Sequence, residues 1–277
     1  MTVVLGLLAA TCYGAADFFG GIATRRSSML AVAILSQGSG FILLLLAFPL
    51  FHGHFSREAL IYGALGGICG GAGIALLYHA LSIGKMGVVS PITAVLAAAL
   101  PVGVGALRGE HLSLWQSAGI VIALLAVVLI SLTTEPDGRF EFSTAGVKEA
   151  IVCGLFLGGF YIFLARAGSG AGLYPLLAAR FASTAFLLFA ALVLRKSILP
   201  ARATVPLVVL VGAMDMTANC LYVLATYAGY LSIAAVLTSL YPASTVFLAR
   251  IVLREHLAPL QKFGVAFALA GVALIAW

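Results

Sequence analysis

The sequence predicts an all-α polytopic membrane protein with ten transmembrane helices, arranged as two inverted repeats of five helices each. Hydrophobic residues make up 63% of the 277 residues and charged residues only 9%, against roughly 25% charged residues in soluble domains. Apolar runs of about 20 residues, the length that crosses a bilayer, recur along the whole chain. The tripeptide Glu110-His111-Leu112 returns as Glu255-His256-Leu257, which indicates an internal duplication.

Each apolar run predicts one helix, because helices and closed barrels are the structures that satisfy every backbone group in lipid. A barrel would need alternating polar residues, and the runs lack them. The longest polar stretch runs from Thr133 to Glu149 and separates five runs from five. We therefore expect a first repeat over 1–133, a connecting loop over 134–145 and a second repeat over 146–277. The predicted helices are 2–22, 30–50, 59–83, 87–107, 114–132, 146–165, 173–194, 204–228, 232–253 and 260–277.

The two halves are related by a shift of 145 residues. Matches among apolar residues carry little information in so apolar a chain, whereas matches of polar residues and glycines are informative. Five crossings is an odd number, so the second half must enter the membrane in the opposite orientation. Inverted repeats place the substrate site near the middle of the membrane, where the halves meet. The informative pairs are Glu110 and Glu255, His111 and His256, Gln116 and Gln261, Gly119 and Gly264, Gly84 and Gly229, and Thr93 and Thr238.

The basic residues orient the chain in the membrane. Loops at one face hold Arg57, Arg108 and Arg166, whereas those at the other face hold most of the remaining Lys and Arg residues. Because cytoplasmic loops are rich in Lys and Arg, we expect both termini outside a cell (plasma or inner) membrane. The net charge of +6 is therefore an orientation signal and does not indicate nucleic-acid binding.

The repeated motif resembles the signature of the drug/metabolite transporter superfamily, specifically of EamA-type ten-helix permeases. The resemblance implies a ten-helix basket with alternating access and small-metabolite substrates, often amino acids that leave the cell. The residues that carry it are Gly109-Glu110-His111-Leu112 with Gln116 and Gly119, Arg254-Glu255-His256-Leu257 with Gln261 and Gly264, and Tyr78-His79-Ala80-Leu81 at the end of the third helix.

Two features depart from the pattern of that family. The second helix of such repeats often carries an arginine, as Arg180 does in the second half, but Gln37 stands in the first half. Many members are drawn with cytoplasmic termini, whereas the charge distribution here favours outside termini. Within the motif, we expect Glu110 and Glu255 to cap the helix that follows each of them, because acids are favourable near a helix N-terminus.

Charged side chains in the membrane interior cost about 2.5 kcal/mol or more on insertion scales, so each one needs a reason. Asp215 lies at the middle of the eighth segment, Arg180 near the middle of the seventh and Asp17 in the outer third of the first. Either Asp215 and Arg180 neutralise each other, or they act on substrate. In the second case Asp215 exchanges protons or meets an amine, and Arg180 binds a carboxylate. Asp17 is a further candidate for proton coupling, or it caps a break in its helix.

Polar and aromatic residues near these charges are candidate substrate ligands. Asn219 and Tyr222 follow Asp215 at positions i+4 and i+7, so all three share one helix face. That face either lines a cavity or forms interhelical hydrogen bonds. The other candidate ligands are Gln37, Tyr78, His79 and Tyr241.

Glycines and prolines are candidates for structural or gating roles. Gly67, Gly70 and Gly71 crowd the third segment, where they allow close approach of a neighbouring helix or form a surface that slides during transport. Pro91 and Pro242 predict kinks in the fourth and ninth segments, which suit a gate.

These features predict a secondary transporter that moves a small amphipathic metabolite by alternating access, with export of aromatic or other apolar amino acids as the specific expectation. No Walker A loop, HExxH or GxSxG motif occurs, so we expect ATP-independent transport, no enzyme activity, no cofactor and no metal. The expected partners are a small-molecule substrate, the lipid bilayer and, as an open alternative, protons. A multidrug, cation or nucleobase exporter, or an intramembrane lipid-modifying enzyme, remains an alternative. Both a monomer and a homodimer fit the sequence.

Overall fold

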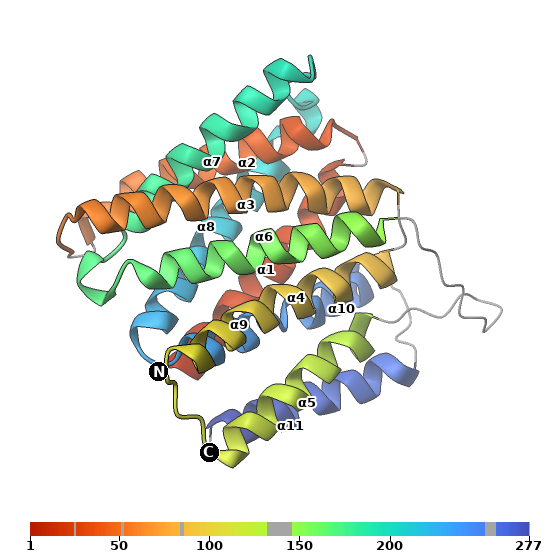
Figure 1. Cartoon of the computed structure of the whole chain (residues 1–277). Coiled ribbons are helices and arrows are strands. Elements are labelled where there is room, and N and C mark those ends of the chain that lie inside the picture. The colour runs from red at the N-terminus through yellow and green to blue at the C-terminus, as the bar shows by residue number, and fades with distance from the viewer. Residues whose placement is uncertain (25, 51–52, 84–85, 132–145, 253–258, 277) are drawn as a thin grey trace.

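The computed structural model describes residues 1–24, 26–50, 53–83, 86–131, 146–252 and 259–276, and every regular element among them is helical (Figure 1). The expected connecting loop 134–145 and the second copy of the motif, Arg254 to Leu257, lie outside these residues. The helices are α1 (Thr2–Thr24), α2 (Met29–Ala47), α3 (Arg57–Ile83), α4 (Met86–Leu107), α5 (Leu114–Ser131), α6 (Val147–Arg166), α7 (Tyr174–Val193), α8 (Val205–Tyr227), α9 (Leu231–Thr238), α10 (Tyr241–Val252) and α11 (Pro259–Ala276), with short 3-10 turns at Phe48–Leu50, Ser169–Ala171 and Arg202–Thr204.

Among the described residues, six helices are long and apolar enough to cross a membrane, namely α1, α2, α3, α6, α7 and α8. Four shorter apolar stretches supply the remaining spans: Ile92–Leu107, Leu114–Leu129, Leu231–Thr245 and Lys262–Ile275. Large apolar side chains such as Leu46, Phe181 and Leu192 are exposed on the outside of the bundle, where lipid is the matching solvent. The predicted fold class, an all-α multi-pass membrane protein, is confirmed.

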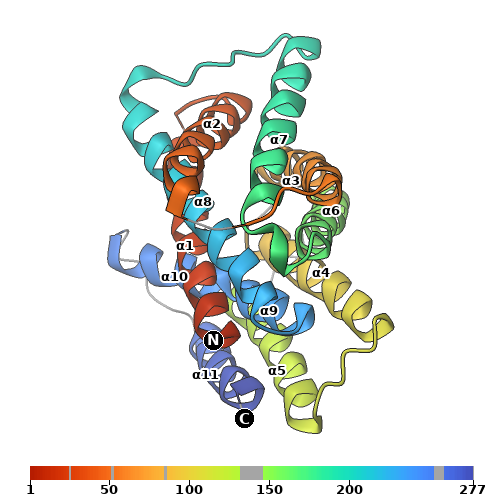
Figure 2. The same cartoon turned by 90° about the vertical axis from the view of Figure 1, so that its left-hand side faces the viewer.

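The helices pack in a pattern that is symmetric between the two halves (Figures 1 and 2). In the first half, α3 packs on α6 and α7 of the second half; in the second, α8 packs on α1 and α2 of the first. Likewise α4 packs on α6, and the α9–α10 pair packs on α1. The last helices of the two halves, α5 and α11, lie side by side (Figure 1). The third helix of each half therefore packs mainly against the first two helices of the other half, as expected for a duplicated unit.

Two glycines that are 145 residues apart allow these exchanged helices to approach closely. A Cβ on Gly67 of α3 would overlap the backbone of Ala179 in α7. A Cβ on Gly212 of α8 would overlap the carbonyl oxygen of Ser36 and the hydroxyl of Ser39 in α2. The α3–α7 contact and the α8–α2 contact therefore both require glycine at the same position of the repeat, because a side chain there would keep the two helices apart.

We expect Gly67→Ala to lower the free energy of unfolding by about 1–3 kcal/mol, because the added methyl group must displace backbone. Gly38→Ala is the matched control, since a Cβ there meets nothing within 4 Å and alanine is the better helix former. Unfolding in mixed micelles, followed by circular dichroism, measures both changes. Equal stability of the two variants would contradict the proposed close contact.

The turn that follows α4 explains the glycine of the repeated motif. Gly109 has a φ of +79°, in the left-handed region that favours glycine. The Glu110 N–H donates to the Gly105 carbonyl oxygen at 3.1 Å, and the Gly109 N–H donates to that of Ala106, also at 3.1 Å. These two hydrogen bonds form a Schellman motif, which ends the helix and fixes where the next residue points.

The start of α5 explains the glutamine of the motif. The Gln116 N–H donates to the Ser113 hydroxyl at 3.1 Å, and the Ser113 N–H donates to Gln116 Oε1 at 3.0 Å, which is a capping box. The prediction that Glu110 caps this same helix is wrong, because its carboxylate accepts hydrogen bonds from the N–H groups of Leu231 and Ser232 instead. Glu110 thus caps α9, in the other half of the chain; the matching expectation for Glu255 lies outside the described residues.

The ninth predicted segment is interrupted and forms α9 and α10. The break falls at Ser239 and Leu240, just before Pro242. Pro242 cannot donate to the carbonyl oxygen of Thr238, four residues earlier, and its ring clashes with that carbonyl, so α9 ends there. In contrast, α4 continues as one helix past Pro91 and Pro101.

Candidate functional site

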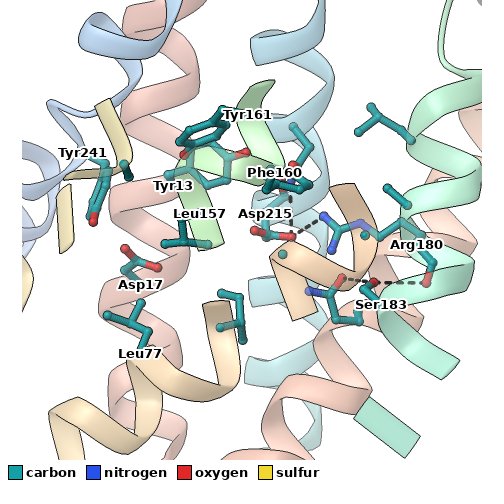
Figure 3. A pocket seen from close by; sticks show the side chains of 18 residues that line it. Tyr13, Asp17, Leu77, Leu157, Phe160, Tyr161, Arg180, Ser183, Asp215 and Tyr241 are labelled. Atoms are coloured by element: carbon teal, nitrogen blue, oxygen red, sulfur yellow. Dashed lines mark hydrogen bonds and ion pairs between the residues drawn. The ribbon is translucent and has the colours of Figure 1, made fainter. Parts of the chain in front are cut away.

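A cavity of about 60 Å³ lies among the helices of both halves (Figure 3). Its lining comes from α1, α2, α3, α4, α6, α7, α8 and the first residue of α10, and most of these residues lie near the middle of their helices. This is the position that an inverted repeat predicts for a substrate site. The polar lining consists of Tyr13, Asp17, Gln37, Tyr161, Arg180, Ser183, Asp215, Asn219 and Tyr241.

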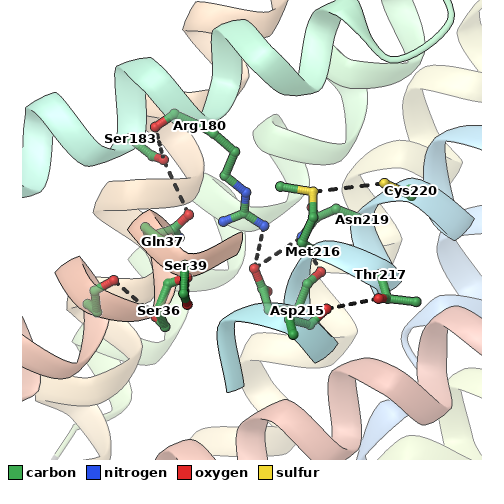
Figure 4. Close-up of polar contacts among 12 residues, drawn as sticks. Ser36, Gln37, Ser39, Arg180, Ser183, Asp215, Met216, Thr217, Asn219 and Cys220 are labelled. Carbon is green, nitrogen blue, oxygen red and sulfur yellow. Dashed lines mark hydrogen bonds and ion pairs between the residues drawn. The ribbon is translucent and has the colours of Figure 1, made fainter. Parts of the chain in front are cut away.

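Arg180 and Asp215 form an ion pair across α7 and α8 (Figure 4). Their side chains are only 6% and 20% exposed, so each charge depends on the other for its stabilisation. The Asn219 side-chain amide donates to the Asp215 backbone carbonyl at 2.7 Å and to its Oδ2 at 3.3 Å. The Asn219 Oδ1 atom is buried and has no hydrogen-bond partner within the described part of the chain. The mutual neutralisation anticipated for this pair therefore occurs in this conformation.

Gln37 occupies the place in the first half that Arg180 occupies in the second. The residues just before them, Ser36 and Ala179, contact the equivalent glycines Gly212 and Gly67. Both side chains line the cavity. The Ser183 hydroxyl connects them, since it contacts Gln37 Oε1 at 3.4 Å and donates to the Arg180 carbonyl oxygen at 3.2 Å (Figure 4). The two halves thus supply one amide and one guanidinium to the same wall.

Asp17 lies on α1 and reaches the same cavity. Its side chain is half-buried, and it makes no hydrogen bond or ion pair with any residue that the structure describes. The carboxylate and cationic side chains in the lining of the cavity are those of Asp17, Asp215 and Arg180. Two carboxylates therefore face one guanidinium, and Asp17 is the carboxylate that this guanidinium does not neutralise.

Three tyrosines line the cavity with Asp17 and the ion pair, and the sequence analysis did not single out two of them, Tyr13 and Tyr161 (Figure 3). The rings of Tyr13 and Tyr161 lie edge to face, with centroids 6.4 Å apart. The buried Tyr13 hydroxyl has no hydrogen-bond partner among the described residues. The sequence shift of 145 residues pairs Asp17 with Ile162 and so does not single out Tyr161. The structure supplies the correspondence: Tyr161 follows Gly158 by three residues, as Asp17 follows Gly14.

Both of those glycines pack against the equivalent helix of the other half. A Cβ on Gly14 would overlap Tyr241 and Ser244 of α10, and one on Gly158 would come within 2.9 Å of Leu100 in α4. Asp17 and Tyr161 are therefore counterparts. The ring of the predicted ligand Tyr222 packs behind Tyr161 at 4.5 Å, and its hydroxyl donates to the Tyr161 carbonyl oxygen at 3.1 Å. It is fully buried and does not line the cavity.

The structure brings three of the remaining sequence candidates to this cavity. Tyr241, Gly67 and Gly70 line it. A Cβ on Gly70 would approach the Phe160 ring to 2.9 Å, so this glycine makes room for an aromatic wall. His79 is exposed and does not line the cavity.

Two other candidates do not line the cavity, and the side chains of two more lie outside the part of the chain that the structure describes. Gly71 contacts Ser183 and Phe186 of α7, and Pro242 is buried next to the α9–α10 break. The side chains of Tyr78 and Pro91 lie outside the described part of the chain. Among the described residues, no group of three His, Cys, Asp or Glu side chains could hold a metal ion.

Comparisons with known proteins identify one family and, separately, a shared fold. A model of the EamA-like transporter family matches residues 1–132 and 144–277. The uncharacterized protein MJ1333.1 of Methanocaldococcus jannaschii is 28% identical over 134 residues, which are 47% of this chain and 96% of that protein. A solved crystal structure superposes with a TM-score of 0.77 and 18% identity, over 99% of this chain and 94% of its own. That similarity shows the shared fold.

Proposed function

Because the chain belongs to the EamA-like transporter family, whose model covers both halves, we propose that it exports small amine-bearing metabolites by alternating access, apolar and aromatic amino acids first among them. The family makes the chain a multi-pass membrane transporter of a small molecule and not an enzyme. The substrate class is our proposal, and the cavity between the halves is its proposed site.

The observation that carries this proposal is the set of charges in the cavity. Asp17 offers a carboxylate to an amine, and Arg180 offers a guanidinium suited to a carboxylate. The buried and unpartnered Asn219 Oδ1 and Tyr13 hydroxyl offer further hydrogen bonds. The apolar part of the lining, which includes Leu157, suits an apolar side chain. A small zwitterion with an apolar body uses all of these features.

A second candidate, export of organic cations, is favoured by one specific observation. Arg180 is already paired with Asp215, so a substrate carboxylate would have to compete for it. A cation without a carboxylate would need only Asp17 and the tyrosine rings, which can also stabilise a cation. The two candidate functions therefore differ in one step. Export of amino acids requires Arg180 to release the Asp215 carboxylate and bind the substrate carboxylate, whereas export of cations does not.

We further propose that Asp17 couples transport to protons. An unpaired carboxylate in the membrane interior is costly, and a proton or a substrate amine removes that cost. Asp215 has Arg180 for this purpose, whereas Asp17 has no cation among the described residues. If Asp17 binds a proton or an amine but never both, inward proton flow drives outward amine flow without ATP.

Uptake into proteoliposomes tests the substrate class with three solutes that share one side chain: phenylalanine, phenethylamine and 3-phenylpropionate. Each is assayed with and without a pH gradient. Saturable transport of phenylalanine above both analogues supports the amino-acid proposal, and a preference for phenethylamine supports the cation candidate. Transport of 3-phenylpropionate alone, or of none of the three by folded protein, would contradict the proposal that an amine is required.

A further inference from the structure

The hydrogen bonds of Glu110 join the two halves at one face of the membrane. We call this the terminal face, because α1 begins and α11 ends there, beside the end of α4 and the start of α9 (Figure 1). Glu110 Oε1 accepts the Leu231 N–H at 2.8 Å, and Oε2 accepts the Ser232 N–H at 3.2 Å. The first N–H groups of a helix have no partner within it and carry the positive end of the helix dipole. A carboxylate from the first half thus stabilises a helix of the second.

The capped helix leads directly to the cavity. All eight residues of α9, from Leu231 to Thr238, are buried, and the helix packs between α1 and α4. At 1.5 Å per residue it is about 12 Å long, and after the break Tyr241 lines the cavity. The helix α4 packs along α9 but makes little contact with α10. α9 therefore lies between the terminal face and the cavity, packed against α1 and α4 of the first half.

The backbone around Glu110 is shaped for this contact. The left-handed Gly109 ends α4 and turns the chain toward α9. A Cβ on Gly105 would overlap the Glu110 carboxylate and the Ser232 hydroxyl. A Cβ on Gly103, one half-turn away, would meet nothing within 4 Å. The absence of a side chain at Gly105 thus leaves room for the carboxylate.

We propose that Glu110 is a latch between the two halves: its carboxylate stabilises the state in which the cavity is closed at the terminal face, and it releases α9 when that face opens. The inference rests on the alternating access of the proposed function but not on the proposed substrate. A cap that only stabilises the fold would lower stability when removed without changing which face is open.

The first test measures the distance between spin labels at Arg108→Cys, beside the latch, and Tyr230→Cys, before α9, after Cys12, Cys69, Cys153 and Cys220 have been replaced by serine. Glu110→Gln removes the charge and keeps the shape, and Gly105→Ala keeps the charge but displaces it. We expect each change to raise the longer-distance population about two- to fivefold, the factor that corresponds to a charge at a helix terminus. Glu58→Gln, an exposed acid in the first turn of α3, and Gly103→Ala are the controls and should change nothing.

The second test labels Ala97→Cys, in the cavity, with a membrane-impermeant thiol reagent added to one face at a time. Glu110→Gln should raise the labelling rate from the terminal face and lower it from the opposite face, because one population grows at the expense of the other. Equal changes from both faces, or unchanged label distances in both latch variants, would overturn the latch. Neither readout needs a transported solute, so failure of the substrate proposal leaves this test intact.

Discussion

Asp17→Asn is expected to remove the pH dependence of substrate binding and to weaken amine binding by at least about tenfold. In the wild type, protons and amines compete for the Asp17 carboxylate, so the apparent affinity for an amine should fall as the pH falls. Asparagine has nearly the same shape but carries neither the charge nor the proton site. Binding titrations of purified protein with phenylalanine and phenethylamine over a range of pH values measure both effects.

The control for this variant is Glu58→Gln, which removes an exposed carboxylate at the start of α3 and should leave affinity and its pH dependence unchanged. If Asp17→Asn retains the wild-type pH dependence while Asp215→Asn loses it, the coupling acid is Asp215. Such a result would mean that the ion pair with Arg180 opens during transport, and it would refute the role proposed for Asp17.

Arg180→Gln is expected to lower the free energy of unfolding by about 3 kcal/mol, at the low end of the range for breaking a buried ion pair. We expect the low end because the Asp215 side chain is 20% exposed, so solvent can partly stabilise its charge once Arg180 is gone. The loss arises because the Asp215 carboxylate is left without its cation. The double variant R180Q/D215N removes both charges and should recover most of that stability, even though it lacks the pair.

Arg166→Gln provides a matched control at an exposed arginine. Its guanidinium Nε donates to the Tyr62 hydroxyl at 3.2 Å and lies 5.4 Å from the centre of that ring, at the end of α6. Exposed contacts of this kind contribute little, so we expect a loss below about 1 kcal/mol. Unfolding in mixed micelles gives the stabilities of the wild type, Arg180→Gln, Asp215→Asn, the double variant and Arg166→Gln. Additive losses for Arg180→Gln and Asp215→Asn in the double variant would show that the pair is not energetically coupled.

Much of the fold could be predicted because the bilayer imposes a length and a polarity on each element. The expected segments 2–22 and 204–228 correspond to α1 and α8 within a few residues. The break between α9 and α10 was foreseeable from Pro242, whose effect on the preceding turn is local. The partner of Glu110 was not foreseeable, because a motif predicts local capping and cannot reveal that Leu231 begins a helix beside it in space.

The charged residues of the candidate site could be predicted from the sequence, because burying a charge in a membrane costs free energy and such residues are therefore rare. Asp17, Arg180 and Asp215 stood out as charges within apolar segments, and all three line one cavity. Tyr161 was missed because one tyrosine in an apolar helix has many explanations. Tyr222 shares a helix face with Asp215 but lies about 10 Å further along the axis, where it packs behind Tyr161. Helical periodicity predicts which face of a helix a residue lies on but not how far along the helix it lies. That position decides whether the residue lines the cavity or packs behind the residues that do.

Counterflow tests most directly whether this chain is a carrier for amine-bearing solutes. Proteoliposomes loaded with unlabelled phenylalanine are diluted into a trace of labelled phenylalanine, and the label inside is followed over time. A carrier that exposes its site alternately predicts a transient accumulation of label above its equilibrium level, which unlabelled phenethylamine outside should suppress. Label that only rises to equilibrium, with no overshoot at any loading concentration, would contradict alternating access for this substrate.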